Sequence, residues 1–263
     1  MSLNPNKRFG QNFLVDNNII EKILESINPS NNEIFLEIGG GMGALTFPLL
    51  ERLNKLNVVE IDKRMVDILR SEEKINLNVI KDNALNINLK DIVKKNNALR
   101  IVGNLPYNIS TPLLFHLLEQ REMVKDMHIM LQKEVVDRIV ASPGNKKYGR
   151  VSVMVSLFCD TEVCFNVSPN SFYPIPKVWS TFIKLKITKN NKYNIIDMKE
   201  FDNLIRLVFS MRRKTLGRSL KTIMQRNDFI SVDIDPILRP ENLEISSFVK
   251  ISNYLFNKNK KIK

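Results

Sequence analysis

Residues that build disulfides and metal sites are scarce in this sequence. Its 263 residues include only two cysteines and two histidines. Cys159 and Cys164 stand five residues apart in a strand-like stretch, which places them on opposite faces, so we expect two buried thiols and no disulfide. His116 and His128 lie in apolar runs without a carboxylate or cysteine cluster nearby, and we interpret them as structural. The sequence therefore predicts no metal site.

Long apolar runs are also missing. No run of about 18 apolar residues occurs, and the N-terminal MSLNPNKRFGQNF lacks the apolar core of a secretory signal. We therefore expect neither membrane insertion nor export, and a cytoplasmic protein by default. The hydrophobic content of 43% is enough for a full core, and the length suits one large domain, alone or with a small appendage.

Acidic residues become scarce toward the C-terminal end. Residues 177–263 carry 19 Lys and Arg against 8 Asp and Glu, whereas residues 1–176 carry 21 against 20. Such a one-sided excess is typical of a protein that binds a polyanion. A solvated surface that only keeps the chain soluble is the alternative, and we favour a nucleic-acid partner over it.

The hydrophobic pattern predicts an α/β fold. Strand-like runs alternate with helical periodicity from residue 17 to residue 187, which is typical of βαβ units and a parallel sheet. The polar run 188–194 ends this pattern, so we predict domains at 1–190 and 191–263, the second one small and helical. We expect about seven strands with an antiparallel edge, at 34–38, 57–61, 76–80, 100–103, 128–131, 150–158 and 180–187.

A basic segment in the second domain is the candidate nucleic-acid contact. Arg212, Arg213 and Lys214 begin the stretch MRRKTLGRSLK, which we predict to be helical with its cations pointing outward. Leu216, Leu220 and Ile223 would form a separate packed face. We predict that the three cations contact phosphates, and a solvated helix face or an intramolecular ion pair is the alternative.

A glycine-rich turn follows the first predicted strand of the sheet. In EIGGGMGAL (37–45), Gly39, Gly41 and Ala44 fit the G-x-G-x-x-A turn of nucleotide-binding α/β folds. Glu60 ends the second strand nineteen residues after Gly41, where a carboxylate can accept hydrogen bonds from ribose hydroxyls. Together these features indicate a cofactor that contains adenosine.

The charge beside this turn selects among such cofactors. Glu37 precedes the first glycine by two residues and would repel the pyrophosphate of a dinucleotide. S-adenosylmethionine has no phosphate, and a carboxylate there can stabilise its ammonium and sulfonium groups, directly or through water. We therefore favour S-adenosylmethionine over NAD, with a glycine turn that binds no ligand as the remaining alternative.

The tetrapeptide Asn-Leu-Pro-Tyr follows the fourth strand, which should neighbour the first strand at the switch point of the sheet. Asn104 can accept one N–H of an adenine amino group, and Leu105, held extended by Pro106, can direct its carbonyl at the other. Tyr107 offers a stacking face. A plain turn is the alternative, but the position opposite the glycine turn favours methyl transfer to an adenine amine.

Eight motifs are spread along the whole chain: KRFGQNFL (7–14), EIGGGMGALT (37–46), VVEID (58–62), VGNLPYNISTPLLFHLL (102–118), MLQKEVVDRI (130–139), YGRVSVM (148–154), SFYPIPKV (171–178) and RRKTLGRSL (212–220). In these motifs the chain resembles, from end to end, the small-subunit ribosomal RNA adenine dimethyltransferases of the KsgA type. That resemblance implies a Rossmann-like class I methyltransferase that uses S-adenosylmethionine as its cofactor. It also implies two methyl groups on N6 of each of two adjacent adenines near the 3′ end of 16S rRNA, within the small ribosomal subunit, and a monomeric enzyme.

The resemblance also implies roles for individual residues. Asn12 and Leu14 would form part of the cofactor-site wall, with Gly39 at the methionine end and Glu60 on the ribose. Asn104 would then serve both the cofactor edge and the target amine. Phe172, the aromatic of the SFYPIPKV stretch, would stack on the flipped target base opposite Tyr107.

Two positions depart from the family pattern. Where the family has an Asp after the third strand, this chain has Asn83, with Asp82 one residue earlier. We assign Asn83 to the cofactor's adenine amino group and keep Asp82 as the fallback. Trp179 stands where the family commonly has Asp, and we interpret it as a packed or rim aromatic, a position for which the sequence offers no functional account.

Two other interpretations share this fold. One is a large-subunit rRNA methyltransferase of the macrolide-resistance kind, which the QKEVVDRI, PIPKV and RRKT segments fit less well. The other is a non-catalytic nucleic-acid binder related to this family. The intact glycine turn, Glu60 and the Asn-Leu-Pro-Tyr turn argue against it.

Overall fold

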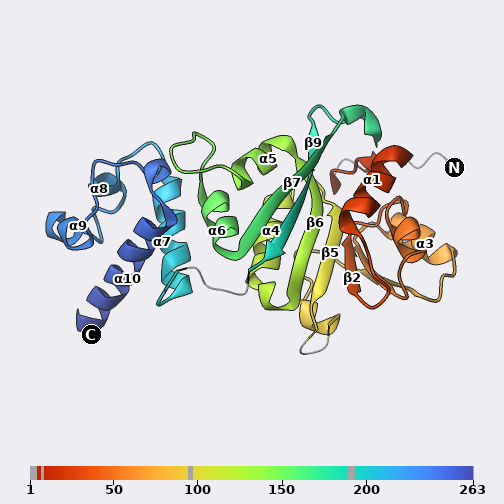
Figure 1. Ribbon diagram of the computed structural model, residues 1–263, viewed down its shortest axis with the longest axis horizontal. Helices are drawn as coiled ribbons and strands as arrows, with labels where there is room; N and C mark the ends of the chain where they lie inside the picture. The colour runs from red at the N-terminus through yellow and green to blue at the C-terminus, as the bar shows by residue number, and fades with distance from the viewer. Residues whose placement is uncertain (1–4, 7–8, 94–96, 189–192, 263) are drawn as a thin grey trace. The chain divides into compact units, whose positions relative to one another are not determined.

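Two compact units make up the computed structural model, which describes residues 5–6, 9–93, 97–188 and 193–262 (Figure 1). The first unit comprises 1–136 and 159–187, and the second comprises 137–158 and 188–263. The predicted domains, 1–190 and 191–263, differ from this division because 137–158 packs with the C-terminal helices. Within the second unit, Arg150 pairs with Asp202 at 2.9 Å, and the amide N–H of Gly144 donates to the carbonyl of Glu241 at 2.7 Å.

The first unit is built on a seven-stranded sheet, counted over the described residues, as the sequence predicts. Its order is β4-β3-β2-β5-β6-β9-β7, with parallel pairing as far as β6 and antiparallel pairing of β9 with β6 and β7. Strands β2 and β5 are neighbours although β3 and β4 intervene in the chain, so the switch point lies between them. The bounds are β2 Ile34–Ile38, β3 Leu56–Glu60, β4 Leu77–Lys81, β5 Leu99–Asn104, β6 Val124–Gln132, β7 Cys159–Val167 and β9 Ser180–Ile187.

A separate two-stranded sheet joins the N-terminal segment to the segment before β9. Its strands are β1 (Phe13–Leu14) and β8 (Phe172–Tyr173), which pair antiparallel. The helices of the first unit are α1 Asn17–Ile27, α2 Thr46–Leu50, α3 Lys63–Ser71 and α4 Ser110–Glu119, with short 3-10 turns η2 Leu89–Asp91, η3 Arg121–Met123 and η4 Pro169–Ser171. Helix α5, Lys133–Ile139, begins in the first unit and ends in the second.

One predicted strand, 150–158, is wrong: it forms helix α6, Arg150–Phe158. The pattern of a short apolar run does not distinguish a buried strand from a buried helix. Here the helix is buried on more than one face, because the consecutive residues Ser152 through Val155 are all buried. The first turn closes at Gly149, whose N–H donates to the Ser152 hydroxyl at 3.0 Å. The seventh strand is instead β7, which holds both cysteines.

The two cysteines of β7 differ in burial. A register shift between Val163 and Phe165 interrupts the pairing of this strand with β9. Cys159 is buried, as expected, but Cys164 is only half-buried, and both thiols are free. The predicted burial is therefore right for the first cysteine alone.

The core of the first unit lies between α1 and the sheet. Asp16 caps α1 by accepting hydrogen bonds from the backbone N–H groups of Asn18 and Ile19. The helix then buries one face, which includes Ile23 and Leu24, in a core cluster that also contains Phe35 of β2 and Val102 of β5.

A buried ionic cluster occupies the β5–β6 part of the sheet. Nε of Arg100 donates to Asp126 at 2.9 Å, Nη1 donates to Glu33 at 2.7 Å, and Nη2 lies 3.2 Å from Nε2 of His128. His128 is fully buried and thus structural, although Asp126 does lie beside it. The described residues contain no group of three or more His, Cys, Asp or Glu side chains arranged to hold a metal ion.

The second unit is helical apart from its turns. Helix α7 (Met198–Ser210) begins at the cap residue Asp197 and buries a face that includes Phe201 and Leu204, with α10 (Ile245–Ile262) packed against it. The remaining elements are α6, α8 Leu216–Ser219, α9 Arg226–Val232 and the 3-10 turn η5 Pro240–Asn242. None of the helices in the described part of the chain is long and apolar enough to cross a membrane.

Candidate cofactor and target-base pocket

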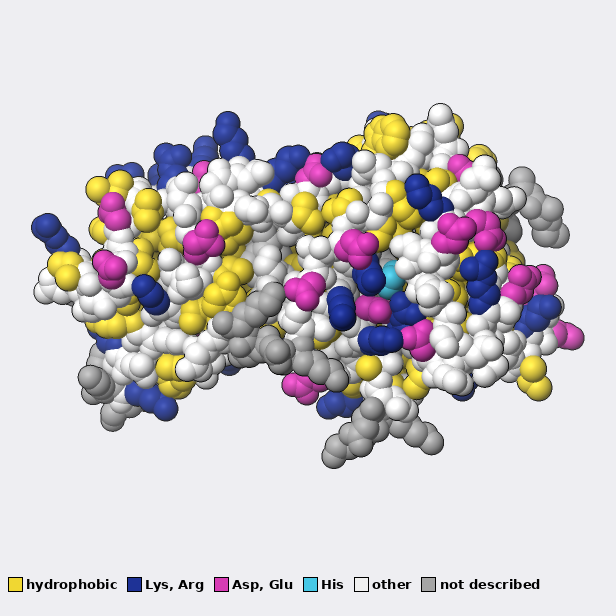
Figure 2. Space-filling model, in the orientation of Figure 1, with side chains coloured by type: hydrophobic (Ala, Val, Ile, Leu, Met, Phe, Trp, Pro, Cys, Tyr) yellow, Lys and Arg dark blue, Asp and Glu magenta, His cyan; other side chains and the backbone are white. Residues whose placement is uncertain are grey.

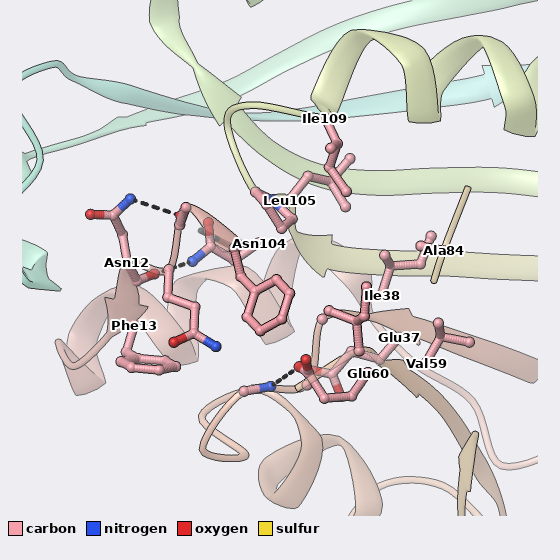
Figure 3. Close-up of a pocket in the computed structure, with 18 of the residues that line it drawn as sticks. Asn12, Phe13, Glu37, Ile38, Val59, Glu60, Ala84, Asn104, Leu105 and Ile109 are labelled. Atoms are coloured by element: carbon pink, nitrogen blue, oxygen red, sulfur yellow. Dashed lines mark hydrogen bonds between the residues drawn. The ribbon is translucent and has the colours of Figure 1, made fainter. Parts of the chain in front are cut away.

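A pocket of about 280 Å³ opens at the carboxyl ends of β2, β3 and β5 (Figure 3). This is the edge at which α/β sheets bind ligands, and the volume lies near the lower end of small-molecule sites, about 300–1,000 Å³. Its lining combines the glycine turn, the Asn-Leu-Pro-Tyr turn and the N-terminal segment. Segments far apart in the sequence therefore meet around one cavity.

The glycine turn requires glycine at specific positions. Gly39 and Gly41 have φ values of +77° and +54°, a region that favours glycine. At Gly40 a Cβ atom would lie 2.6 Å from the side chain of Val58, so the turn packs directly on β3. The backbone N–H of Gly39 donates to the carbonyl of Val59 at 2.8 Å. The turn is thus fixed before any ligand binds.

Glu60, at the end of β3, is held by backbone donors. Its carboxylate accepts hydrogen bonds from the N–H of Gly41 at 3.0 Å and from the N–H of Asp62 at 2.8 Å. Burial raises the pKa of Glu60, and its side chain lines the pocket. Hydroxyl donors of a ligand could therefore meet a preoriented acceptor at the predicted position.

Glu37 lies deeper, beneath the turn. It is 2% exposed and accepts a hydrogen bond from the Thr46 hydroxyl at 2.6 Å. Burial raises the pKa of Glu37 to about 7, and the nearby Glu60 carboxylate adds to this shift. The group therefore changes charge near neutral pH, and a cation in the pocket would favour its ionised form.

The N-terminal segment, including Asn12 and Leu14, forms one wall of the pocket. The side-chain amide of Asn104 donates to the backbone carbonyl of Asn12 at 2.8 Å, a bond drawn in Figure 3. Nε2 of Gln11 donates to Asp62 at 2.8 Å and fixes this segment against the start of α3. The wall is therefore tied both to β5 and to the turn after β3.

Sequence reasoning overlooked the Gln11–Asp62 pair. Asp62 had a local signal, since it caps α3 by accepting the N–H of Arg64 at 3.1 Å, and an Asp before a helical run is a standard cap. Gln11 has no such pattern. Its partner is 51 positions away in the sequence, and only the folded chain brings the two together.

The Asn-Leu-Pro-Tyr turn continues β5 into the pocket. Because Nδ2 of Asn104 is engaged with Asn12, its Oδ1 is left as an acceptor, and no donor bonds to it among the described residues. The hydroxyl of Tyr107 shares a hydrogen bond of 2.6 Å with the hydroxyl of Ser180, which fixes the tyrosine ring. Leu105 and Pro106 line the same cavity.

Asn83 and Asp82 both line the pocket, and their geometry does not choose between them. Oδ1 of Asn83 accepts the N–H of Leu85 at 3.0 Å, and Oδ1 of Asp82 accepts the N–H of Asn83 at 2.6 Å. Each oxygen thus stabilises the turn after β4 and retains a lone pair. The assignment of Asn83 to the cofactor stays a prediction.

Phe172 lies away from the pocket lining. Its side chain is 2% exposed and packs in the core with Leu14, the residue it faces across the β1–β8 pair, and with Phe182. In this arrangement its ring is covered and offers no face to a base. The residue that follows, Tyr173, is exposed instead, because successive strand residues point to opposite faces.

The candidate phosphate contacts lie in the second unit. Residues 211–214 form a turn after α7, and α8 spans only four residues, so the predicted continuous helix is wrong. Nε of Arg212 donates to Glu241 at 2.8 Å, so for Arg212 the structure shows the intramolecular ion pair that we gave as the alternative to a phosphate contact. Arg213 and Lys214 are exposed and form no ion pair with any described residue. Lys and Arg side chains gather along the upper edge of this unit in Figure 2.

The strand order, the antiparallel β9 and β7 and the pocket at the switch point together define a class I methyltransferase fold. The chain belongs to the ribosomal RNA adenine dimethylase family, which it matches over residues 2–257. It is similar to the ribosomal RNA small subunit methyltransferase A of Hahella chejuensis, with 44% identity over 95% of this chain and 93% of that protein. The Buchnera aphidicola protein of the same name is 42% identical over 97% of this chain and 94% of its own length.

Two solved structures resemble the fold. A dimethyladenosine transferase from Plasmodium falciparum has a TM-score of 0.78 and 29% identity, covering 95% of this chain and 98% of that one. The 23S rRNA methyltransferase ErmE has a TM-score of 0.70 and 20% identity, covering 93% and 100%. The likeness to ErmE concerns the fold alone.

Proposed function

We propose that this chain is an S-adenosylmethionine-dependent rRNA (adenine-N6,N6)-dimethyltransferase. Its substrate is two adjacent adenines near the 3′ end of 16S rRNA in the small ribosomal subunit, and it acts as a cytoplasmic monomer. One observation carries the proposal: the acceptor Oδ1 of Asn104 has no partner among the described residues and belongs to the same cavity as the glycine turn and Glu60.

The lining fits S-adenosylmethionine in charge and in hydrogen-bonding capacity. Glu60 offers a buried acceptor for ribose hydroxyls, and Asn83 offers an amide oxygen to the adenine amino group. Gly39 and the carboxylate of Glu37 lie where a positively charged methionine end is favoured over a phosphate. Asn12 and Leu14 close the wall. When bound, the cofactor supplies an activated methyl group.

The protein's own part in the reaction is to hold the amine. Oδ1 of Asn104 accepts one N–H of the adenine amino group and the carbonyl of Leu105 accepts the other, so the nitrogen lone pair is directed at the methyl donor. Once one methyl has replaced a hydrogen, a neutral amide leaves no unpaired buried charge. The target adenine must leave its stack to enter the pocket, where the fixed ring of Tyr107 can receive it.

The second unit binds the phosphates of the RNA. Arg213 and Lys214 are exposed and unpaired among the described residues, so they are the strongest phosphate contacts of the RRK segment. Arg212 would first have to leave Glu241. Phe172 could stack on the target base only after its side chain turned out of the core, so that role has no support from its present position.

The choice of ribosomal subunit depends on sequence likeness. The fold does not separate a small-subunit enzyme from a large-subunit one, since ErmE shares it with a TM-score of 0.70. Relatives named small-subunit methyltransferase A reach 44% identity over nearly the whole chain, whereas ErmE is 20% identical. This difference supports the small subunit.

The test uses purified ribosomal subunits that lack the modification. Small and large subunits are incubated separately with the protein and labelled S-adenosylmethionine, and the RNA is digested to nucleosides. We expect N6,N6-dimethyladenosine from the small subunit only. Label in the large subunit would support the macrolide-resistance alternative, and no label in either would favour a non-catalytic binder.

A further inference from the structure

Most aromatic side chains in the described part of the chain are buried or partly buried. Among the described residues, Tyr173 and Trp179 are the Phe, Tyr or Trp side chains that are exposed, at 55% and 51%. They lie in one short segment, together with exposed Ile175 and Val178. Apolar side chains gathered on a surface indicate an interaction site, whereas singly scattered ones do not.

This segment borders the pocket at both of its ends. At one end, Tyr173 faces Phe13 across the β1–β8 pair, and Phe13 lines the pocket. At the other end, the carbonyl of Trp179 accepts the N–H of Lys133 at 2.8 Å, and the next residue, Ser180, holds the hydroxyl of Tyr107. The segment thus lies at the upper end of β9 in Figure 1.

The composition of the segment suits an unpaired nucleotide. Pro174 and Pro176 restrict the backbone, so less conformational freedom is lost when a ligand binds. Lys177, which lies between Pro176 and Trp179 in the sequence, is exposed and can bind a phosphate. Exposed aromatic rings combined with a cation are the means by which proteins bind single-stranded RNA.

We propose that Trp179 and Tyr173 form a stacking face for the unpaired nucleotide next to the adenine that occupies the pocket. This inference rests on the proposed function, because it requires an RNA substrate with adjacent adenines. When one adenine leaves the stack, its neighbour loses a stacking partner. An aromatic ring at the rim replaces that partner, which an Asp at position 179 could not do.

The test measures methylation of under-methylated small subunits by Trp179→Ala, Trp179→Phe and Trp179→Leu, with Ile75→Ala as a control. Ile75 is a fully exposed apolar residue of the first unit outside the pocket lining. Stacking on an aromatic ring contributes to binding, so Trp179→Ala should raise KM for subunits between about fivefold and a hundredfold with little change in kcat. Tyr173→Ala should act in the same direction.

The substitutions to Phe and Leu separate stacking from other apolar contact. Trp179→Phe should restore most of the affinity, whereas Trp179→Leu should resemble Trp179→Ala. Full affinity of the leucine variant would indicate a contact with a protein surface and would overturn the proposal, as would an unchanged KM in Trp179→Ala. If the wild-type protein methylates no subunit, the proposed function itself fails. That result can be told apart from a failure of the stacking proposal, in which the wild-type protein is active and only the variants behave differently from expectation.

Discussion

The pocket and the basic turn after α7 present opposite kinds of binding surface. In the pocket, Glu37 and Glu60 are buried and each accepts hydrogen bonds at fixed distances. In the turn, Arg213 and Lys214 are exposed without ion-pair partners among the described residues. A preorganised site favours one ligand geometry, whereas exposed cations favour any nearby phosphate. Changes in the two regions should therefore affect different measurements.

The largest effect is expected from Asn104→Ala. The lost acceptor acts at the reacting amine, so turnover should fall by about 10²–10³ while subunit binding stays nearly intact. Single-turnover methylation and a subunit-binding titration measure the two quantities. Asn86→Ala is the control, because Asn86 is exposed and lies outside the pocket lining. A variant that keeps half the wild-type turnover would contradict the assignment of Asn104 as the acceptor at the reacting amine.

Glu60→Ala should weaken cofactor binding next most strongly. Hydrogen bonds to a charged group contribute about 1.5–3 kcal/mol, so calorimetry should show S-adenosylmethionine affinity lowered by about one to two orders of magnitude. Subunit affinity should not change. Glu72→Ala removes an exposed carboxylate just after α3 and should leave both unaffected. Equal losses in the two variants would mean that only net charge matters.

The pH dependence of cofactor affinity tests Glu37. Burial raises its pKa from an ordinary 4.5 to about 7, so the carboxyl is largely protonated at pH 6 and ionised at pH 8. A cationic ligand binds the ionised form better, and affinity should rise by up to about tenfold between these pH values. Glu37→Gln should flatten the profile. A profile unaltered by that substitution would contradict the role of Glu37.

Glu37 should affect the stability of the folded protein in the opposite direction to cofactor affinity as pH rises. Because the folded-state pKa of Glu37 is raised, the folded protein retains a proton that the unfolded chain has released between about pH 4.5 and pH 7. Without the cofactor, this group's contribution to the free energy of unfolding should fall as pH rises through that window. Denaturant unfolding of wild type and Glu37→Gln at several pH values measures the difference.

The basic turn should control the salt dependence of subunit binding. Each neutralised phosphate adds about 0.7–0.9 to the magnitude of the negative slope of log affinity against log salt concentration. The double substitution Arg213→Ala with Lys214→Ala should therefore reduce the magnitude of this slope by about one to two. Arg212→Ala should do less, because Arg212 is already paired with Glu241. Cofactor affinity should stay unchanged throughout. An equal slope in wild type and the double variant would exclude phosphate contacts by this pair.

The smallest effect concerns the adenine end of the cofactor. A neutral hydrogen bond contributes about 0.5–1.5 kcal/mol, so Asn83→Ala should weaken S-adenosylmethionine binding by roughly two- to tenfold. Asp82→Ala should have less effect if Asn83 is the acceptor. Calorimetry on both variants decides, and the reverse order would transfer the role to Asp82.

The sequence predicted the position of the pocket better than the packing around it. Glu60 and Asn104 end strands of a parallel sheet and Gly39 directly follows one, so alternation alone places them at one edge. Whether Phe172 or Tyr173 faces the core depends on a two-residue strand, which has too few positions to show a period. The Arg212–Glu241 pair joins residues 29 positions apart, and no local pattern indicates it.

The position of the modified nucleotides tests the central claim most directly. Two methyl groups on N6 replace both amino hydrogens, one of which adenine donates in Watson–Crick pairing, so reverse transcription stops at such a residue. Under-methylated small subunits treated with the protein and S-adenosylmethionine should give stops at two adjacent adenines near the 3′ end of 16S rRNA, and Asn104→Ala should give none. Stops elsewhere, or equal stops with Asn104→Ala, would contradict the account.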